Sequence, residues 1–158
     1  MKRLGLLAAV SVGLASPALA ADTHTAWLGF FTVTATTAAC AGIGGTSVGD
    51  TNVSVYRAGQ SATDTTSMSI IFTKAAINFA NANEAANRQM RGNGTANVSA
   101  MNGKGKPFSY STTYSSIVTT PANVLNGSQY VTITGVLNNM WSTAGCNVTF
   151  KAVYGKEV

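Results

Sequence analysis

Apolar and polar residues alternate with a period of two along much of this chain, and no other feature constrains the fold as strongly. In one such run Val131, Ile133 and Leu137 share a face, and threonines occupy the other face. Successive side chains of a strand point to opposite sides. Each run therefore predicts a strand with one buried face and one solvent-exposed face. Similar runs cover residues 31–36, 52–57, 68–72, 95–101, 108–118 and 146–154.

Turn-forming residues separate these runs. Glycine, asparagine or proline interrupts the chain at residues 41–45, 58–60, 92–94, 102–103 and 121–127. Short strands bounded by turns are typical of sandwiches and small barrels. We predict an all-β fold, a single antiparallel β-sandwich of Greek-key or jelly-roll type, with at most one or two short helices.

Two stretches depart from simple alternation. In residues 74–90, the spacing of Ile77 and Phe79 indicates a strand, whereas the many alanines indicate a helix. We predict a strand through Phe79 and a short helix near residues 83–90.

The first strand is apolar on both faces, which predicts that both faces are covered. Its large apolar residues are Trp27, Leu28, Phe30 and Phe31. An exposed patch of that size on a strand is an aggregation hazard. We therefore expect all four side chains to be buried, either by the rest of this chain or by a neighbouring subunit, and we favour burial within the same chain.

Residues 1–20 have the form of a bacterial secretory signal peptide. A basic start at Lys2 and Arg3 precedes an apolar run, and the segment ends in an A-x-A cleavage pattern at Ala20. We expect residues 21–158 to form the exported domain, in the periplasm or outside the cell. No later segment has the run of apolar residues that a transmembrane helix needs.

The chain has two cysteines, Cys40 and Cys146. In an oxidising compartment they predict one disulfide, which would link the end of the first strand to the start of the last. The chain has no C-x-x-C motif, so the bridge is interpreted as structural rather than redox-active. An intermolecular bridge or two free thiols are the alternatives.

Residues suited to catalysis or metal binding are few. His24 is the only histidine, and it lies close to the expected mature terminus, where residues are usually poorly ordered. A Ser–His or Cys–His mechanism would therefore lack a firmly positioned histidine. Asp50 and Asp64 lie in turn contexts, and with Glu84 they are the candidates for a glycosidase-like carboxylate pair. We interpret them as turn and surface residues, and predict no catalytic site, metal or cofactor.

The basic residues are scattered along the chain, which argues against nucleic-acid binding. Aromatic residues are the remaining candidates for recognition. Phe108, Tyr110 and Tyr114 share one predicted strand face, which either stacks on sugar rings or packs in the core. Trp141, in the connection of residues 138–145, either covers the end of the core or reaches a partner. The candidate contacts are therefore Trp141, Tyr110 and Tyr114.

These observations predict an exported, non-enzymatic binding or cell-surface structural module whose partner is unknown. A small secreted hydrolase and an eight-stranded outer-membrane barrel are alternatives.

Residues 31–40, an alternating strand followed by a cysteine, resemble the N-terminal strand of pilin-type fibre subunits. That resemblance implies self-association, in which this strand completes a neighbour's sheet. The distant position of Cys146 departs from the short bridge of those subunits.

Overall fold

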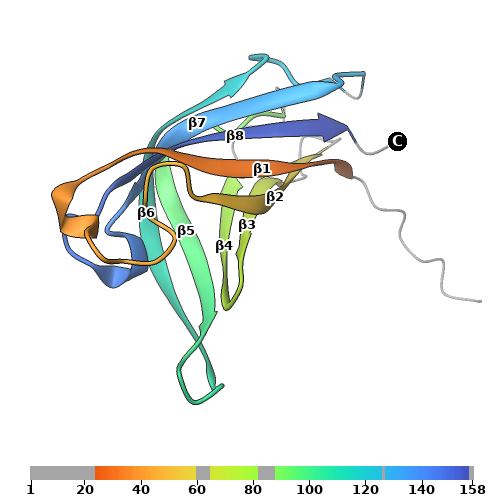
Figure 1. Cartoon of the computed structure of the whole chain (residues 1–158). Helices are drawn as coiled ribbons and strands as arrows, with labels where there is room; N and C mark the ends of the chain where they lie inside the picture. The colour runs from red at the N-terminus through yellow and green to blue at the C-terminus, as the bar shows by residue number, and fades with distance from the viewer. Residues whose placement is uncertain (1–23, 60–64, 82–87, 126, 157–158) are drawn as a thin grey trace, which may run out of the picture.

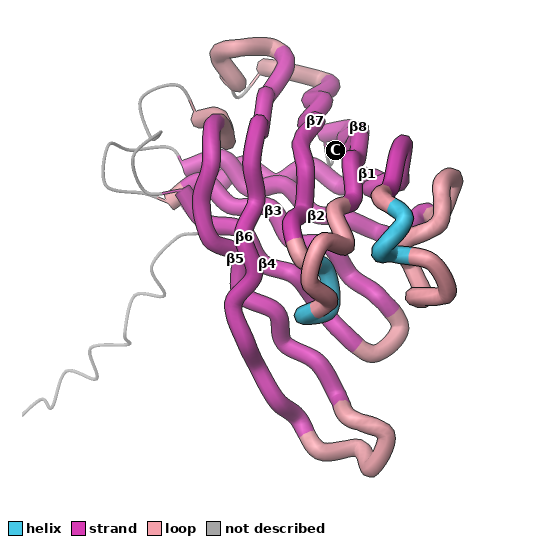
Figure 2. The backbone as a smooth tube through the Cα atoms, turned by 90° about the vertical axis from the view of Figure 1, so that its left-hand side faces the viewer, coloured by secondary structure: helices cyan, strands magenta, loops and turns pink. Residues whose placement is uncertain are grey.

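The chain folds into one closed antiparallel β-barrel. The computed structural model describes residues 24–59, 65–81, 88–125 and 127–156. Each strand pairs with its neighbours in sequence, and the last strand pairs with the first (Figure 1). The strands are β1 (His24–Thr36), β2 (Thr51–Gly59), β3 (Thr66–Phe72), β4 (Ala75–Asn81), β5 (Gly92–Met101), β6 (Pro107–Thr120), β7 (Tyr130–Asn138) and β8 (Val148–Lys156). Two short 3-10 helices, η1 (Ala38–Cys40) and η3 (Met140–Ser142), lie in connections at one end (Figure 2).

The all-β prediction is therefore confirmed, but the sandwich is wrong. β1 pairs with β2 on one side and with β8 on the other, so that Trp27 lies opposite both Tyr56 and Lys156. The pairing of the first and last strands closes the wall and removes the free edges that two open sheets would keep. Alternation along a strand shows which side chains face inward, but it does not show whether the inward faces belong to one closed sheet or to two stacked sheets.

The barrel interior is filled by side chains. The largest fully buried ones include Trp27, Phe31, Tyr56, Phe79, Phe150 and Tyr154. Ring centroids of Phe31 and Phe150 lie 4.9 Å apart, and those of Tyr56 and Tyr154 lie 5.7 Å apart. A barrel of eight strands has an interior about wide enough for side chains to fill, which matches this packing.

Buried hydroxyl groups inside the barrel have hydrogen-bond partners. The Tyr154 hydroxyl lies 2.8 Å from Oγ of Ser54, which itself donates to the Ser69 carbonyl. The Tyr56 hydroxyl donates to the Arg88 carbonyl. Burial raises the pKa of Tyr56 and of Tyr154, because the phenolate form would be poorly solvated there. These groups stay neutral and serve the packing of the core.

The outer-membrane alternative shares the strand number of this barrel, but the interior of this barrel and the outside of β5 and β6 differ in polarity from those of a membrane barrel. Membrane barrels carry an apolar band outside and a polar interior. Here the interior is apolar, and the outward residues of β5 and β6 are mostly serine, threonine and asparagine.

β1 is buried on one face only, which corrects the expectation that all four of its large residues are covered. Trp27 and Phe31 are fully buried, whereas Leu28 is 50% and Phe30 is 60% exposed. Because β1 belongs to the barrel wall, alternate residues must point outward. The strand is therefore covered by its own chain on the inner face alone.

A β-bulge in β6 changes which residues face inward. Register shifts between Ser115 and Val118, and Ser116 has a positive φ of 55°. As a result Tyr114 and Ile117 are buried while Val118 is 56% exposed, although strict alternation placed Val118 on the face of Tyr114. An extra residue at a bulge reverses the phase of all residues that follow it.

The ambiguous stretch of residues 74–90 begins as a strand. β4 runs through Phe79 to Asn81, which confirms the predicted strand. Residues 82–87 lie outside the described part of the chain, and residues 88–90 form a turn and coil rather than helix.

The neighbouring residues Phe30 and Phe31 provide a test of this inward and outward assignment. Phe31→Ala should lower the free energy of unfolding by about 3–5 kcal/mol, as expected for truncating a buried aromatic side chain. Phe30→Ala should lower it by less than about 1 kcal/mol, because that ring is exposed. Urea denaturation of both variants measures the difference, and equal losses would contradict the assignment.

Gly29 is predicted to be essential for closing the barrel. A Cβ at this position would collide with the backbone of β8, at the Val153 carbonyl. Gly29→Ala should lower the free energy of unfolding by about 3 kcal/mol or more, because backbone cannot move aside as a side chain can. Gly155→Ala is the matched control in the paired strand, since a Cβ there meets nothing within 4 Å. Thermal unfolding measures the loss for each variant. Equal losses would contradict a close contact between Gly29 and the β8 backbone.

Candidate ligand site at the disulfide end of the barrel

Four connections gather at one end of the barrel, which we call the disulfide end. They join β1 to β2, β3 to β4, β5 to β6, and β7 to β8. The strand ends nearest the two chain termini lie at the opposite end (Figure 1). The β5–β6 hairpin extends beyond the other strands at the disulfide end (Figures 1 and 2).

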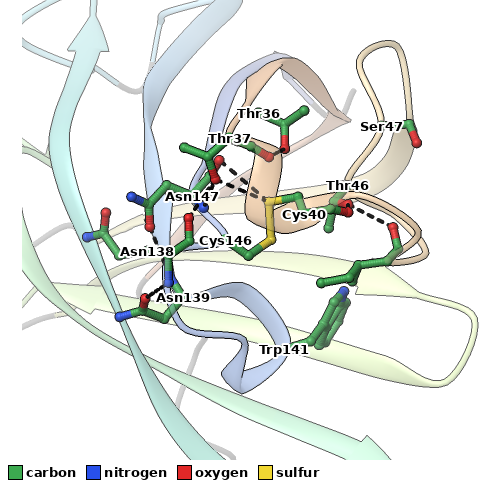
Figure 3. Close-up of a disulfide and its surroundings, with 12 residues drawn as sticks. Thr36, Thr37, Cys40, Thr46, Ser47, Asn138, Asn139, Trp141, Cys146 and Asn147 are labelled. Atoms are coloured by element: carbon green, nitrogen blue, oxygen red, sulfur yellow. Dashed lines mark hydrogen bonds between the residues drawn. A yellow bond between two sulfur atoms is a disulfide. The ribbon is translucent and has the colours of Figure 1, made fainter.

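A disulfide between Cys40 and Cys146 links two of these connections, as the sequence predicted. The Cα atoms of the two cysteines lie 4.6 Å apart (Figure 3). Beside the bridge, Thr37 Oγ1 donates to the Gly145 carbonyl at 2.6 Å and accepts from the Asn147 N–H at 2.9 Å. The β1–β2 and β7–β8 connections are thus held together by a covalent bond and by flanking hydrogen bonds.

The β7–β8 connection has an unusual backbone. Asn139, Trp141 and Ser142 have φ values of 50°, 53° and 61°, in the left-handed region that glycine normally occupies. The side-chain oxygen of Asn139 accepts a hydrogen bond from the Gly145 N–H at 2.8 Å, which closes the loop. For a residue as large as tryptophan this conformation costs free energy, and such costs concentrate at functional sites.

Trp141 is fixed by two contacts across the disulfide end. Its Nε1–H donates to the Gly44 carbonyl at 3.1 Å, and its ring meets Phe72 edge to face with centroids 4.9 Å apart. Phe72 in turn lies against the buried ring of Phe31 at 6.4 Å. The half-buried indole therefore covers part of the core and also remains accessible from outside.

A hollow of about 460 Å³ opens between these rings and the neighbouring turns. The residues that line it are Gly44, Gly45, Asn52, Phe72, Thr73, Lys74, Ala75 and Trp141. Two aromatic rings form apolar walls, and Lys74, Asn52 and Thr73 contribute a cation, an amide and a hydroxyl group. Pockets that bind small molecules combine apolar walls with a few polar groups in this way.

Of the other candidate contacts, Tyr110 lies beside the site and Tyr114 lies in the core. The Tyr110 hydroxyl is hydrogen-bonded to Ser142, next to Trp141. Partial burial raises the pKa of Tyr110, and the hydrogen bond from Ser142 opposes that shift. Tyr114 is only 3% exposed and its ring packs 5.2 Å from Phe79. Tyr110 can therefore position the loop that carries Trp141, whereas Tyr114 fills the interior.

Of the three acidic candidates, Asp50 is the one that lies among the described residues. The carboxylate of Asp50 accepts a hydrogen bond from the Ser47 N–H at 2.8 Å, which is the turn interaction expected from its sequence context. Asp64, Glu84 and the side chain of His24 lie outside what the structure describes. Within the described ranges, no three histidine, cysteine or acidic side chains come close enough to hold a metal ion.

Sequence reasoning missed the partners of Trp141. Phe72 ends β3, Lys74 lies in the β3–β4 turn, and Gly44 lies in the β1–β2 connection. Nothing in their local patterns indicates that these segments meet. The predicted disulfide was the one available signal, because it places the β1–β2 connection next to Trp141.

Comparison with known proteins gives no further guide to the site. No family model, curated protein or solved structure matches the chain significantly. In the described part of the chain, no helix has the length and apolar character required to cross a membrane.

The disulfide should contribute strongly to stability. It closes a loop with a sequence separation of 106, so Cys40→Ala/Cys146→Ala should lower the free energy of unfolding by about 4–5 kcal/mol. Urea denaturation measures this loss, and the oxidised and reduced forms of the native chain serve as the control pair. A loss below about 1 kcal/mol would show that the flanking hydrogen bonds alone hold the two connections together.

Proposed function

We propose that this chain is a non-enzymatic binding protein whose ligand site is the hollow at the disulfide end. The ligand is a small molecule with a flat ring and an anionic group. The observation that carries the proposal is the hollow of about 460 Å³ that is lined by the contacting rings of Trp141 and Phe72 and by Lys74.

The chemistry of the lining supports this ligand class. The accessible ring of Trp141 provides a stacking surface for a planar or sugar ring. The Lys74 ammonium is the cation in the lining and would pair with a carboxylate, sulfate or phosphate group. The volume lies within the range of about 300–1,000 Å³ that is usual for small-molecule sites.

The pairing of β1 bears on the fibre alternative. Both edges of β1 are hydrogen-bonded within the chain, to β2 and to β8. A strand that completes a neighbour's sheet must have a free edge, and its own subunit must lack a strand. This geometry favours a self-contained binding domain.

Export is part of the same proposal. The Cys40–Cys146 disulfide supports an oxidising compartment, either the periplasm or the extracellular space of a bacterium. The proposed signal peptide, residues 1–20, lies outside the described residues.

The fluorescent probe anilinonaphthalene sulfonate, a flat aromatic anion, tests the site. We expect saturable binding to the folded chain. Trp141→Ala should weaken binding about ten-fold, since an aromatic contact is worth about 0.5–1.5 kcal/mol beyond the buried area. Lys74→Gln should weaken it about five-fold through loss of an exposed ion pair.

Two controls make that experiment specific. Lys104→Gln removes the same charge from the β5–β6 turn, outside the hollow, and should leave the dissociation constant unchanged. Val118→Thr removes an exposed apolar side chain from the side of the barrel, outside the hollow, and should also have no effect. Probe binding that responds to either control but not to Trp141→Ala would place the ligand elsewhere and contradict the proposal.

A further inference from the structure

Six apolar side chains lie next to one another on the outward face of four adjacent strands, β8, β1, β2 and β3. Five of them are between 43% and 60% exposed, and Val55 is half-buried. We call this group the apolar belt; it consists of Leu28, Phe30, Val53, Val55, Ile71 and Val153. Exposed apolar residues scattered singly are ordinary, but a contiguous group indicates an interaction surface.

The strand register makes the belt contiguous. Phe30 lies directly opposite Val153 on β8 and opposite Val53 on β2. Val53 in turn lies opposite Ile71 on β3, and Leu28 lies opposite Val55 in the next outward row. Side chains directly opposite each other on one face are about 5 Å apart, so the belt forms one continuous surface with Phe30 near its centre.

The opposite side of the barrel is polar. The outward residues of β5 and β6 at matching depth are Thr95, Asn97, Ser99, Ser109, Ser111 and Thr113. Hydroxyl and amide side chains thus form the solvent-exposed surface of β5 and β6. Exposed apolar residues also occur on β5 and β6, including Met101 and Val118. The contiguous apolar group lies on the side of β8, β1, β2 and β3, which is the property of a docking face.

The charged residues within the four strands of the belt are cationic. Asp50, the acidic residue just before β2, accepts a hydrogen bond from the Ser47 N–H. Lys151 is exposed two residues before Val153, and Arg57 is exposed two residues after Val55, so the two cations flank the belt on its two margins. None of the eight strands contains an aspartate or a glutamate. The surface therefore combines exposed apolar groups with a cationic margin.

This combination selects among partners. In a two-fold dimer the same patch meets itself, which would bring the cationic margins of two copies towards each other. A neutral apolar partner would leave Lys151 and Arg57 without counter-charges. An anionic lipid surface provides phosphate groups for the cations and an acyl boundary for Phe30 and Leu28.

We propose that the apolar belt docks the barrel, side-on, to the surface of a membrane that contains anionic lipids. Tyr130 adds to this surface, because it is 74% exposed and lies opposite Gly155 in the row of Leu28. Its ring is apolar and its hydroxyl is polar, which suits the headgroup level of a bilayer. This docking leaves the disulfide end free.

Sedimentation with lipid vesicles tests the docking. The protein is residues 21–158, which contain all eight strands, because the apolar leader would itself bind lipid. We expect binding to mixed phosphatidylcholine and phosphatidylglycerol vesicles and little binding to pure phosphatidylcholine. Leu28→Thr/Phe30→Thr should reduce the partition coefficient at least about ten-fold. Val118→Thr, an exposed strand valine outside the belt, should leave it unchanged.

A second pair of variants tests the cationic margin. Arg57→Gln/Lys151→Gln should weaken binding by about five-fold for each charge removed. Lys104→Gln/Lys106→Gln removes the same charge from the β5–β6 turn and should have much less effect. Equal effects of the two pairs would show non-specific attraction and overturn the proposal. Binding that survives Leu28→Thr/Phe30→Thr would overturn it as well.

The oligomeric state separates lipid docking from self-association. Light scattering should show a monomer in the absence of vesicles. A dimer that Phe30→Thr dissociates would assign the belt to a second copy of the chain and contradict lipid docking.

Discussion

The pairing of β1 with β8 is the contact on which the rest of this structure depends. It converts a row of antiparallel hairpins into a closed wall and leaves no strand edge unpaired. Gly29 makes this seam close-fitting, since it faces the β8 backbone where a larger residue would collide. Closure also limits where function can reside. A wall without edges offers its two ends and its outer surface for recognition.

Much of the local structure could be predicted from the sequence, because alternation is a local property. The strands around Val131, Phe150 and Ile70 follow directly from it, and so does burial of Phe31. Closure could not be predicted in the same way. It depends on pairing between the first and last strands, and alternation in β1 is the same in a sandwich and in a barrel.

The errors at Phe30 and Val118 have distinct physical causes. An exposed Phe30 is unexpected only if every large apolar residue must be buried, and interaction surfaces violate that rule. The position of Val118 depends on a bulge at Ser116, where the backbone is left-handed. Glycine at that position would have indicated such a backbone in the sequence, but the residue is a serine. At the candidate site, Trp141 was identifiable as an aromatic residue in a connection, and Tyr110 as an aromatic residue on a predicted strand face. Phe72 and Lys74 were not, because only the three-dimensional fold brings the β3–β4 turn to that loop.

The seam also determines how the barrel would respond to tension. Consecutive strands are joined by the chain, whereas β8 and β1 are joined covalently only through Cys40–Cys146, at the far end of the seam from the termini. Force applied at the start of β1 and the end of β8 would separate these strands one hydrogen-bonded pair at a time. Peeling would stop at the disulfide, so only the segments before Cys40 and after Cys146 could lengthen. The intervening chain, residues 41–145, includes every residue that lines the hollow and would bear no load while the bridge remained intact.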